Sequence, residues 1–216
     1  MRGDKLVILE VHVKAARQLA ELLLPQIEES RKKFIITIAG ESGSGKSEIA
    51  KVLFDLFAEK DIETIILQQD DYFVYPPKTN SEMRKKDIGH VGLSEVRLSL
   101  LDQNLRDIID GKNLIEKPLV IFEKDRIDSE TLNFDGVKVI IVEGTYTTTL
   151  KNIDRHVFIN RTYEDTRESR IMRAREEQDD FLERILKIEH EIISSHKSQA
   201  DIIITKKYNA EKNCGK

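Results

Sequence analysis

The chain has 216 residues, a length that is typical of one α/β domain and sufficient to bury a core without crosslinks. Its formal net charge of −4 and its 6% content of aromatic residues disfavour nucleic-acid binding. The only cysteine, Cys214, excludes an internal disulfide, and because the sequence shows neither a signal-peptide pattern nor a run of about 18 apolar residues, we expect a cytoplasmic protein without a membrane span.

Helical and strand patterns alternate from the N-terminus onward. Residues 10–31 repeat apolar side chains at helical spacing, and residues 34–39 (FIITIA) form a short β-branched run that is typical of a buried parallel strand. Residues 47–60 carry an apolar stripe at i, i+3, i+4 and i+7, and residues 64–67 form a second buried run. This order of strand, helix and strand predicts a βαβ unit.

An irregular segment then interrupts the alternation. Residues 71–93 contain Pro76, Pro77 and several turn-forming residues, and a long excursion of this kind inside a compact domain is usually functional or disordered. Regular patterns resume with a helix at 93–110, strands at 119–122, 137–142, 156–159 and 201–205, and a polar helical region at 162–195 with a break near 178–180. The whole pattern predicts one domain over residues 1–216, with a parallel sheet covered by helices on both faces.

The turn after the first strand carries the most specific motif of the sequence. Residues 40–47 read GESGSGKS and match G-x-x-x-x-G-K-[ST] between a buried strand and an amphipathic helix. Glycines let backbone N–H groups turn toward a phosphate, and the helix N-terminus adds its positive end. We therefore predict that Lys46 reaches the β- and γ-phosphates of ATP and that the Ser47 hydroxyl binds Mg²⁺. The predicted phosphate-binding residues are Gly40, Glu41, Ser42, Gly43, Ser44, Gly45, Lys46 and Ser47. The motif does not rank ATP against GTP.

Acidic residues follow two of the predicted strands. Glu143 comes directly after residues 137–142, where a carboxylate can help to hold Mg²⁺, and Gly144 beside it permits close backbone approach. Asp70 and Asp71 follow the second strand. Phosphoryl transfer to an alcohol needs a carboxylate that orients the hydroxyl and accepts its proton. Because adjacent side chains diverge, we favour Asp70 as this base and also expect it to bind the metal together with Ser47 and Glu143. Asp71 is left as a turn former or substrate contact.

An arginine-rich stretch lies in the polar helical region. Arg167, Arg170 and Arg173 share one face of a helix, which could close over ATP and neutralise charge on the transferring group. The alternative is a solvated surface on which these arginines pair with neighbouring glutamates. With the phosphate motif upstream, we favour a lid over residues 162–182 in which Arg170 and Arg173 act on the phosphates.

The motifs together resemble a known family. GESGSGKS, QQDDYF, VIIVEGTY, the arginine-rich helix and SHKSQADIII occur in the order seen in the uridine kinase and phosphoribulokinase family of P-loop kinases. The resemblance implies a P-loop kinase fold: a five-stranded parallel sheet flanked by helices, with a helical lid and an acceptor-site insertion. It also implies that Asp70 is the general base, that Glu143 is a second acidic group near Mg²⁺, and that Arg170 and Arg173 belong to the lid.

The acceptor motifs depart from those of uridine kinases. Uridine kinases usually carry Phe-Asp-His-Pro, where residues 88–91 here read Ile-Gly-His-Val. They also carry Pro-x-Tyr-Asp-Phe followed by a histidine, where residues 118–122 here lack the tyrosine and the aspartate and the histidine position corresponds to Asp125. The expected acceptor contacts are Asp71, Tyr72, His90 and Phe122.

The expected activity is transfer of the γ-phosphate of Mg-ATP to a hydroxyl of a small nucleoside-like or sugar-like acceptor. Uridine or cytidine is the first expected acceptor; nicotinamide riboside, pantothenate or a pentose phosphate are alternatives. A non-kinase ATPase or a nucleotide-binding regulator is the alternative class. The helix at residues 10–31 exceeds what the βαβ units need; we favour a cover for one sheet face over a contact in a homo-oligomer.

Overall fold

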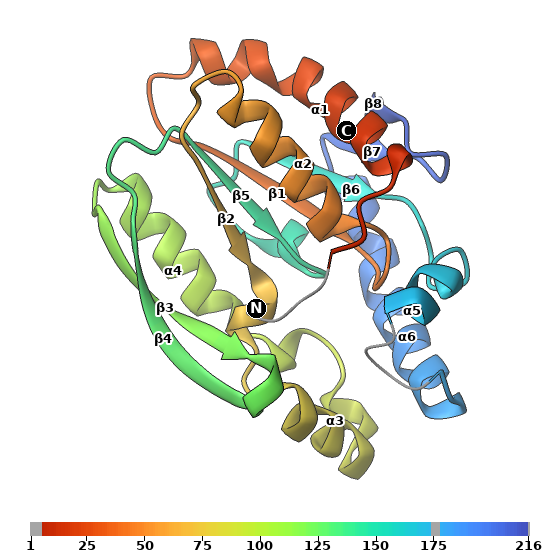
Figure 1. Cartoon of the computed structure of the whole chain (residues 1–216). Coiled ribbons are helices and arrows are strands. Elements are labelled where there is room, and N and C mark those ends of the chain that lie inside the picture. The colour runs from red at the N-terminus through yellow and green to blue at the C-terminus, as the bar shows by residue number, and fades with distance from the viewer. Residues whose placement is uncertain (1–5, 174–177, 216) are drawn as a thin grey trace.

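The structure is a computed structural model that describes residues 6–173 and 178–215. Its centre is a six-stranded sheet in the order β2-β5-β1-β6-β7-β8 (Figure 1). The strands are β1 (Phe34–Gly40), β2 (Thr64–Gln68), β5 (Val139–Glu143), β6 (Arg155–Ile159), β7 (Ile202–Ile204) and β8 (Ala210–Lys212). All neighbouring pairs are parallel except β7 with β8. The predicted parallel sheet is confirmed, and β8 adds an antiparallel edge strand that the sequence pattern did not predict.

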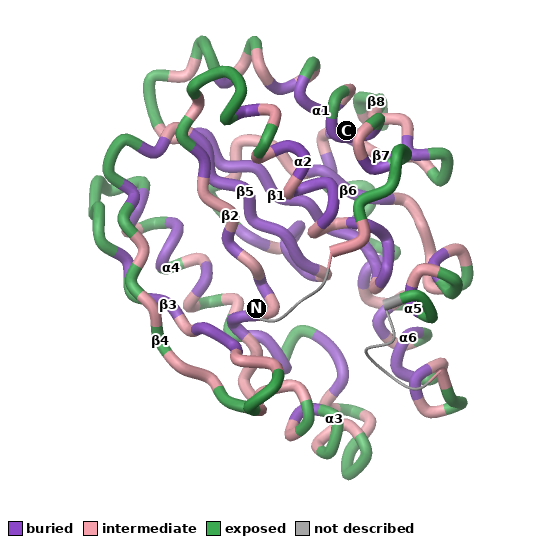
Figure 2. The backbone as a smooth tube through the Cα atoms, viewed as in Figure 1, coloured by how far each residue is buried: buried purple, intermediate pink, exposed green. Residues whose placement is uncertain are grey.

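Helices cover both faces of this sheet, as predicted. Successive strand side chains point to opposite faces, so Ile36 of β1 packs in one core and Ile35 in the other. The first core contains α1 (Glu10–Glu29) and α2 (Lys46–Ala58), and the second contains α4 (Leu98–Ile109). Figure 2 shows β1 and β5, at the centre of the sheet, buried along their length.

The N-terminal helix α1 packs within its own chain. Its Leu19 and Leu23 are fully buried in the same core as Leu53 of α2. The side-chain oxygen of Gln18 accepts a hydrogen bond from the backbone N–H of Ala210 at 2.9 Å, which ties α1 to the edge strand β8. Through these contacts α1 covers one face of the sheet.

The segment 71–93 is more regular than expected. It contains α3 (Pro77–Lys86) and the short 3-10 helices η2 (Ile88–His90) and part of η1 (Gln69–Tyr72), followed by η3 (Leu93–Glu95). The prediction of a loop without secondary structure was wrong because α3 is polar: among its residues only Asn80 is buried, so it has no apolar stripe to detect.

A two-stranded antiparallel sheet follows α4. It consists of β3 (Leu114–Ile121) and β4 (Arg126–Asn133), which pair along their whole length. The predicted strand at 119–122 is only the end of β3, and β4 was missed because every residue in it is partly or fully exposed. At the hairpin tip, the Asp125 carboxylate accepts hydrogen bonds from the backbone N–H groups of Lys78 (2.6 Å) and Thr79 (3.2 Å). The hairpin therefore caps the first turn of α3.

The polar helical region divides into two helices. They are α5 (Arg167–Arg173) and α6 (Asp180–Ile193), and the side chain of Asp179 caps α6 by accepting a hydrogen bond from the Leu182 N–H at 2.8 Å. Residues 174–177, which include Arg175, and the side chain of Arg173 lie outside the part of the chain that the structure describes. In the described ranges no helix combines the length and apolar character needed to cross a bilayer.

Candidate active site

The carboxyl ends of β1, β2 and β5 open into a cavity of about 540 Å³. Its floor is the phosphate loop, residues 40–47, and its walls come from α3, the β3 end of the hairpin and α6. Parallel strands direct their carboxyl ends to one edge of the sheet, which is the usual place for a ligand in an α/β domain. The predicted site residues that line the cavity are Ser42, Gly43, Lys46, Ser47, Asp70, Phe122 and Glu143.

The phosphate loop has the backbone geometry that the motif predicts. Gly43 (φ +75°) and Gly45 (φ +96°) are left-handed, a conformation that favours glycine. Gly45 precedes α2, so the N-terminus of this helix faces the cavity. The Lys46 ammonium donates to the backbone oxygen of Glu41 at 3.0 Å, which holds it over the loop. The remaining predicted phosphate-binding residues, Gly40, Glu41, Ser44 and Gly45, form the buried body of the turn.

Glu143 lies between the phosphate loop and β2. One carboxylate oxygen accepts hydrogen bonds from the Ser47 hydroxyl and from the Gln68 side-chain amide, both at 3.1 Å. Burial raises the pKa of Glu143 above its ordinary value of 4.5, and the negative charge of Asp70 raises it further, against the opposing charge of Lys46. A buried carboxylate beside a second acidic group is an environment that a cation would stabilise.

The donors at this point fit Mg²⁺ held jointly with phosphate oxygens. Mg²⁺ usually binds one or two carboxylates, several waters and substrate phosphates, and a phosphate loop adds its Ser or Thr hydroxyl. Ser47 and Glu143 supply such oxygens in direct contact with each other, and Asp70 lines the same cavity. Within the described residues, no group of three His, Cys, Asp or Glu side chains could hold a metal by itself.

The ends of β2 and β5 are locked together beside these carboxylates. A β-carbon at Gly144 would lie 2.3 Å from Cβ of Gln69, so only glycine fits there. The Gln69 side-chain oxygen accepts a hydrogen bond from the Tyr146 N–H at 2.7 Å. The predicted close approach at Gly144 is therefore made by a side chain, and it fixes the turn that carries Asp70 next to Glu143.

The two adjacent aspartates point in different directions. Asp70 lines the cavity, whereas Asp71 is 3% exposed and is bound by the Lys117 ammonium (2.7 Å) and the Val120 N–H (3.0 Å). Tyr72 is fully buried, and its hydroxyl accepts a hydrogen bond from the Asn104 amide at 3.0 Å. The structure therefore does not bring Asp71 or Tyr72 to the cavity, although both were expected to contact the acceptor.

The other two expected acceptor contacts differ in position. Phe122 lines the cavity, as does Tyr75. His90 contacts two residues that line the cavity. Its ring centroid is 5.8 Å from that of Tyr75, and its Nε2 is 3.1 Å from the Asn80 side-chain oxygen. His90 thus supports residues that line the cavity and does not line it itself.

Sequence reasoning missed the wall that α3 and α6 build at the far end of the cavity. The α6 side chains Leu182, Ile185 and Leu186 have the spacing of an ordinary core stripe, which hides their position at a site. The polar lining residues of α3 are Lys78, Asn80, Ser81, Glu82, Arg84 and Lys85.

Arg170 reaches the phosphate loop from the lid side. It is 5% exposed, and its guanidinium donates to the Tyr163 backbone oxygen at 2.5 Å and to the Thr166 hydroxyl at 2.8 Å. A β-carbon at Gly43 would lie 2.9 Å from Cγ of Arg170, so the side chain rests directly on the loop. Arg167, on the predicted shared face, is exposed.

Replacing Glu143 with Gln is expected to separate stability from activity. Because the folded-state pKa of Glu143 is raised, the native protein binds more protons here than the unfolded chain, and stability falls as pH rises from 4.5 through the raised pKa. Glu143→Gln keeps the shape without the buried charge. We expect a higher melting temperature than wild type at neutral pH without Mg²⁺, and a roughly 10- to 100-fold lower turnover. Thermal unfolding across this pH range and a steady-state assay test both; a lower melting temperature at neutral pH would contradict the argument.

Comparisons with known proteins agree with this geometry. The sequence model of the phosphoribulokinase/uridine kinase family matches residues 35–209. The chain is 30% identical over 191 residues to the bifunctional alpha-galactosidase/sucrose kinase AgaSK of Mediterraneibacter gnavus. The matched region covers 82% of this chain but only 20% of that longer protein. The chain is 31% identical over 188 residues to the uridine kinase of Macrococcus caseolyticus (strain JCSC5402), covering 80% of this chain and 88% of that protein. A solved structure described as a possible uridine kinase from Bacillus stearothermophilus has the same fold, with a TM-score of 0.63, 17% identity, and coverage of 87% of this chain and 97% of its own.

Proposed function

Because the chain belongs to the phosphoribulokinase/uridine kinase family, we propose that it transfers the γ-phosphate of ATP to a hydroxyl group of a nucleoside-like or sugar-like metabolite. The observation that carries this proposal is the convergence of Lys46, Ser47, Asp70 and Glu143 on one cavity. A hydrolytic switch needs no acceptor pocket, whereas this cavity of about 540 Å³ continues from the phosphate loop to α3 and α6.

The roles follow from position and charge. Lys46 and the loop amides bind the β- and γ-phosphates, and Arg170 adds positive charge from the lid side. Mg²⁺, held by Ser47 and Glu143 together with phosphate oxygens, would neutralise charge on the transferring group. Asp70 orients the acceptor hydroxyl and accepts its proton as the new bond forms. Such positioning supplies most of the acceleration in phosphoryl transfer.

For the acceptor, uridine or cytidine is the first candidate. The cavity offers a carboxylate at Asp70 for a hydroxyl, and aromatic side chains at Phe122 and Tyr75 for a planar base. A free sugar is the second candidate. It is favoured by the glycine at position 89, where uridine kinases usually have an aspartate, and by the similarity to a protein that is named a sucrose kinase.

The test is acceptor-dependent ADP release with Mg-ATP across nucleosides, free sugars, pentose phosphates, pantothenate and nicotinamide riboside. We expect one class to stimulate ADP release, and Lys46→Ala to lower kcat/KM by roughly 100- to 1,000-fold because the γ-phosphate loses its cation. Lys51→Ala is the matched control, since Lys51 forms an exposed ion pair with Asp55 on the same helix and should behave as wild type. Equal ADP release with and without every acceptor would favour an ATPase, and nucleotide binding without turnover would favour a regulator.

A further inference from the structure

We propose that Glu41, the second residue of the phosphate loop, is a positioning residue. Its carboxylate clamps the loop to the start of the lid at Tyr163 and to α6 at His190. The inference rests on the proposed kinase function, because its consequence is the placement of Arg170 over a bound nucleotide. Glu41 occupies a variable position of the phosphate motif, so the motif predicts a role for its backbone in the phosphate loop and none for its side chain.

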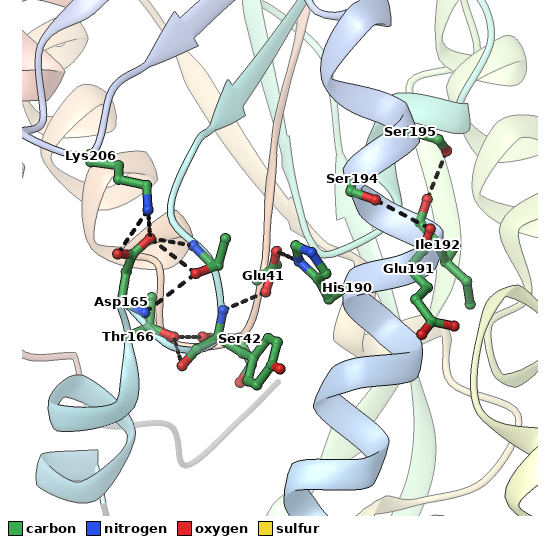
Figure 3. Close-up of polar contacts among 12 residues, drawn as sticks. Glu41, Ser42, Asp165, Thr166, His190, Glu191, Ile192, Ser194, Ser195 and Lys206 are labelled. Carbon is green, nitrogen blue, oxygen red and sulfur yellow. Dashed lines mark hydrogen bonds and ion pairs between the residues drawn. The ribbon is translucent and has the colours of Figure 1, made fainter.

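The Glu41 carboxylate bridges two segments that are far apart in the sequence. One oxygen accepts the Tyr163 N–H at 2.5 Å, and the other lies 2.7 Å from Nδ1 of His190. The Glu41 side chain is 6% exposed and that of His190 is 35% exposed. The Tyr163 and His190 rings meet edge to face at 5.7 Å, which closes a triangle of contacts. Figure 3 shows the labelled Glu41 between the strand-to-lid segment, which carries Asp165 and Thr166, and His190 on α6.

The clamp continues to the arginine that lies on the loop. Glu41 holds the N–H of Tyr163, and the carbonyl of the same residue accepts the Arg170 guanidinium at 2.5 Å. The Thr166 hydroxyl binds Arg170 at 2.8 Å and donates to the Ser42 backbone oxygen at 2.8 Å. Arg170 is therefore positioned through Tyr163 and Thr166, both of which are anchored on the phosphate loop.

On its α6 side the clamp extends to the far end of the cavity, which α3 and α6 line and where the acceptor would bind. Glu189, which precedes His190 on α6, accepts a hydrogen bond from Arg84 of α3 at 3.1 Å. Arg84 also pairs with the fully buried Glu95. Consecutive residues of one helix thus contact the loop that binds the donor and the helix that lines the acceptor end.

A chance ion pair at Glu41 and a clamp predict opposite effects of Glu41 on nucleotide affinity. A carboxylate in a loop that binds a triphosphate opposes that anion, so by charge alone its removal should tighten nucleotide binding. The clamp predicts the reverse: removing the carboxylate frees the lid segment, and the affinity for nucleotide falls. The sign of the effect therefore distinguishes the two explanations.

The experiment measures binding of Mg²⁺ with the non-hydrolysable analogue AMP-PNP by calorimetry, without any acceptor. Glu41→Ala and His190→Ala should each raise Kd roughly tenfold, as expected for loss of a hydrogen bond to a charged group. Glu41→Gln and His190→Gln keep side chains that can bridge the same atoms and should recover most of the affinity. Hydrogen exchange provides a second readout: AMP-PNP should protect α5 amides in wild type and in the Gln variants, but much less in the Ala variants, with α4 unchanged throughout.

Two further variants make the result decisive. Glu191→Gln alters the next residue of α6, which is exposed, and should bind as wild type. Unchanged or tighter binding in both Ala variants, or an equal loss in Glu191→Gln, would overturn the clamp. Lys46→Ala separates this failure from that of the proposed function: if it too binds AMP-PNP as wild type, the loop is not the nucleotide site and the kinase proposal fails first.

Discussion

Asp70→Asn is expected to lower kcat by roughly 100-fold or more while leaving the affinity for Mg-AMP-PNP nearly unchanged. Asparagine keeps the size and a hydrogen-bonding oxygen of Asp70, so the acceptor hydroxyl can still be oriented. It cannot accept the proton, and phosphoryl transfer must then proceed without a general base. The measurement is steady-state turnover at saturating ATP with whichever acceptor gives the largest rate, together with calorimetric binding of the analogue.

The control for this substitution is Asp55→Asn, on the exposed side of α2, which should change neither kcat nor Kd. Unchanged turnover in Asp70→Asn would exclude Asp70 as the base. A large loss of analogue affinity with unchanged kcat would instead assign Asp70 to binding the metal–nucleotide complex. The two measurements therefore separate proton transfer from ground-state binding.

Much of the fold could be predicted because its signals are local. The apolar run at 34–39 lies in β1 and the run at 137–142 overlaps β5. Both strands are buried on both faces, and parallel strands of this kind leave a clear pattern. By contrast, β4 carries charged and polar residues in RIDSETLN, and its stability comes from pairing with β3, which sequence periodicity does not report. Helix α3 was missed for the same reason, since tertiary contacts such as the Asp125 cap hold it.

In the candidate site too, local sequence signals predicted some residues and only tertiary contacts place the others. The phosphate loop is a contiguous motif, and Glu143 directly follows the apolar run 137–142 and ends β5, so the sequence pattern alone predicted both at the edge of the sheet. The separation of Asp70 from Asp71 depends on Lys117, which is distant in sequence, and adjacent side chains offer no local signal for such a choice. The clamp between Glu41 and His190 joins residues 149 positions apart, and only the folded chain places them together.

Lys117 is the residue on which the orientation of this turn depends. Its side chain is 2% exposed, and its ammonium lies 2.7 Å from Asp71, 2.9 Å from Glu130 and 2.8 Å from the Pro118 carbonyl oxygen. Asp71 also accepts the Val120 N–H, so one buried cluster fixes the turn at Asp71 to β3. Because Asp70 precedes Asp71 directly, anchoring one carboxylate in the interior directs the other into the cavity.

Lys117→Met is therefore expected to lower the free energy of unfolding by about 3–5 kcal/mol, since it leaves a buried carboxylate without its cation. Urea denaturation measures this loss, and kcat should fall in the fraction that remains folded because the Asp70 turn loses its anchor. The double variant Lys117→Met/Asp71→Asn removes both charges and should recover at least half of the stability. Lys112→Met, which breaks an exposed pair with Asp107, should change stability by less than about 1 kcal/mol. If the double variant were no more stable than Lys117→Met, the cost would come from lost packing around Lys117, and the electrostatic anchoring of the turn would be rejected.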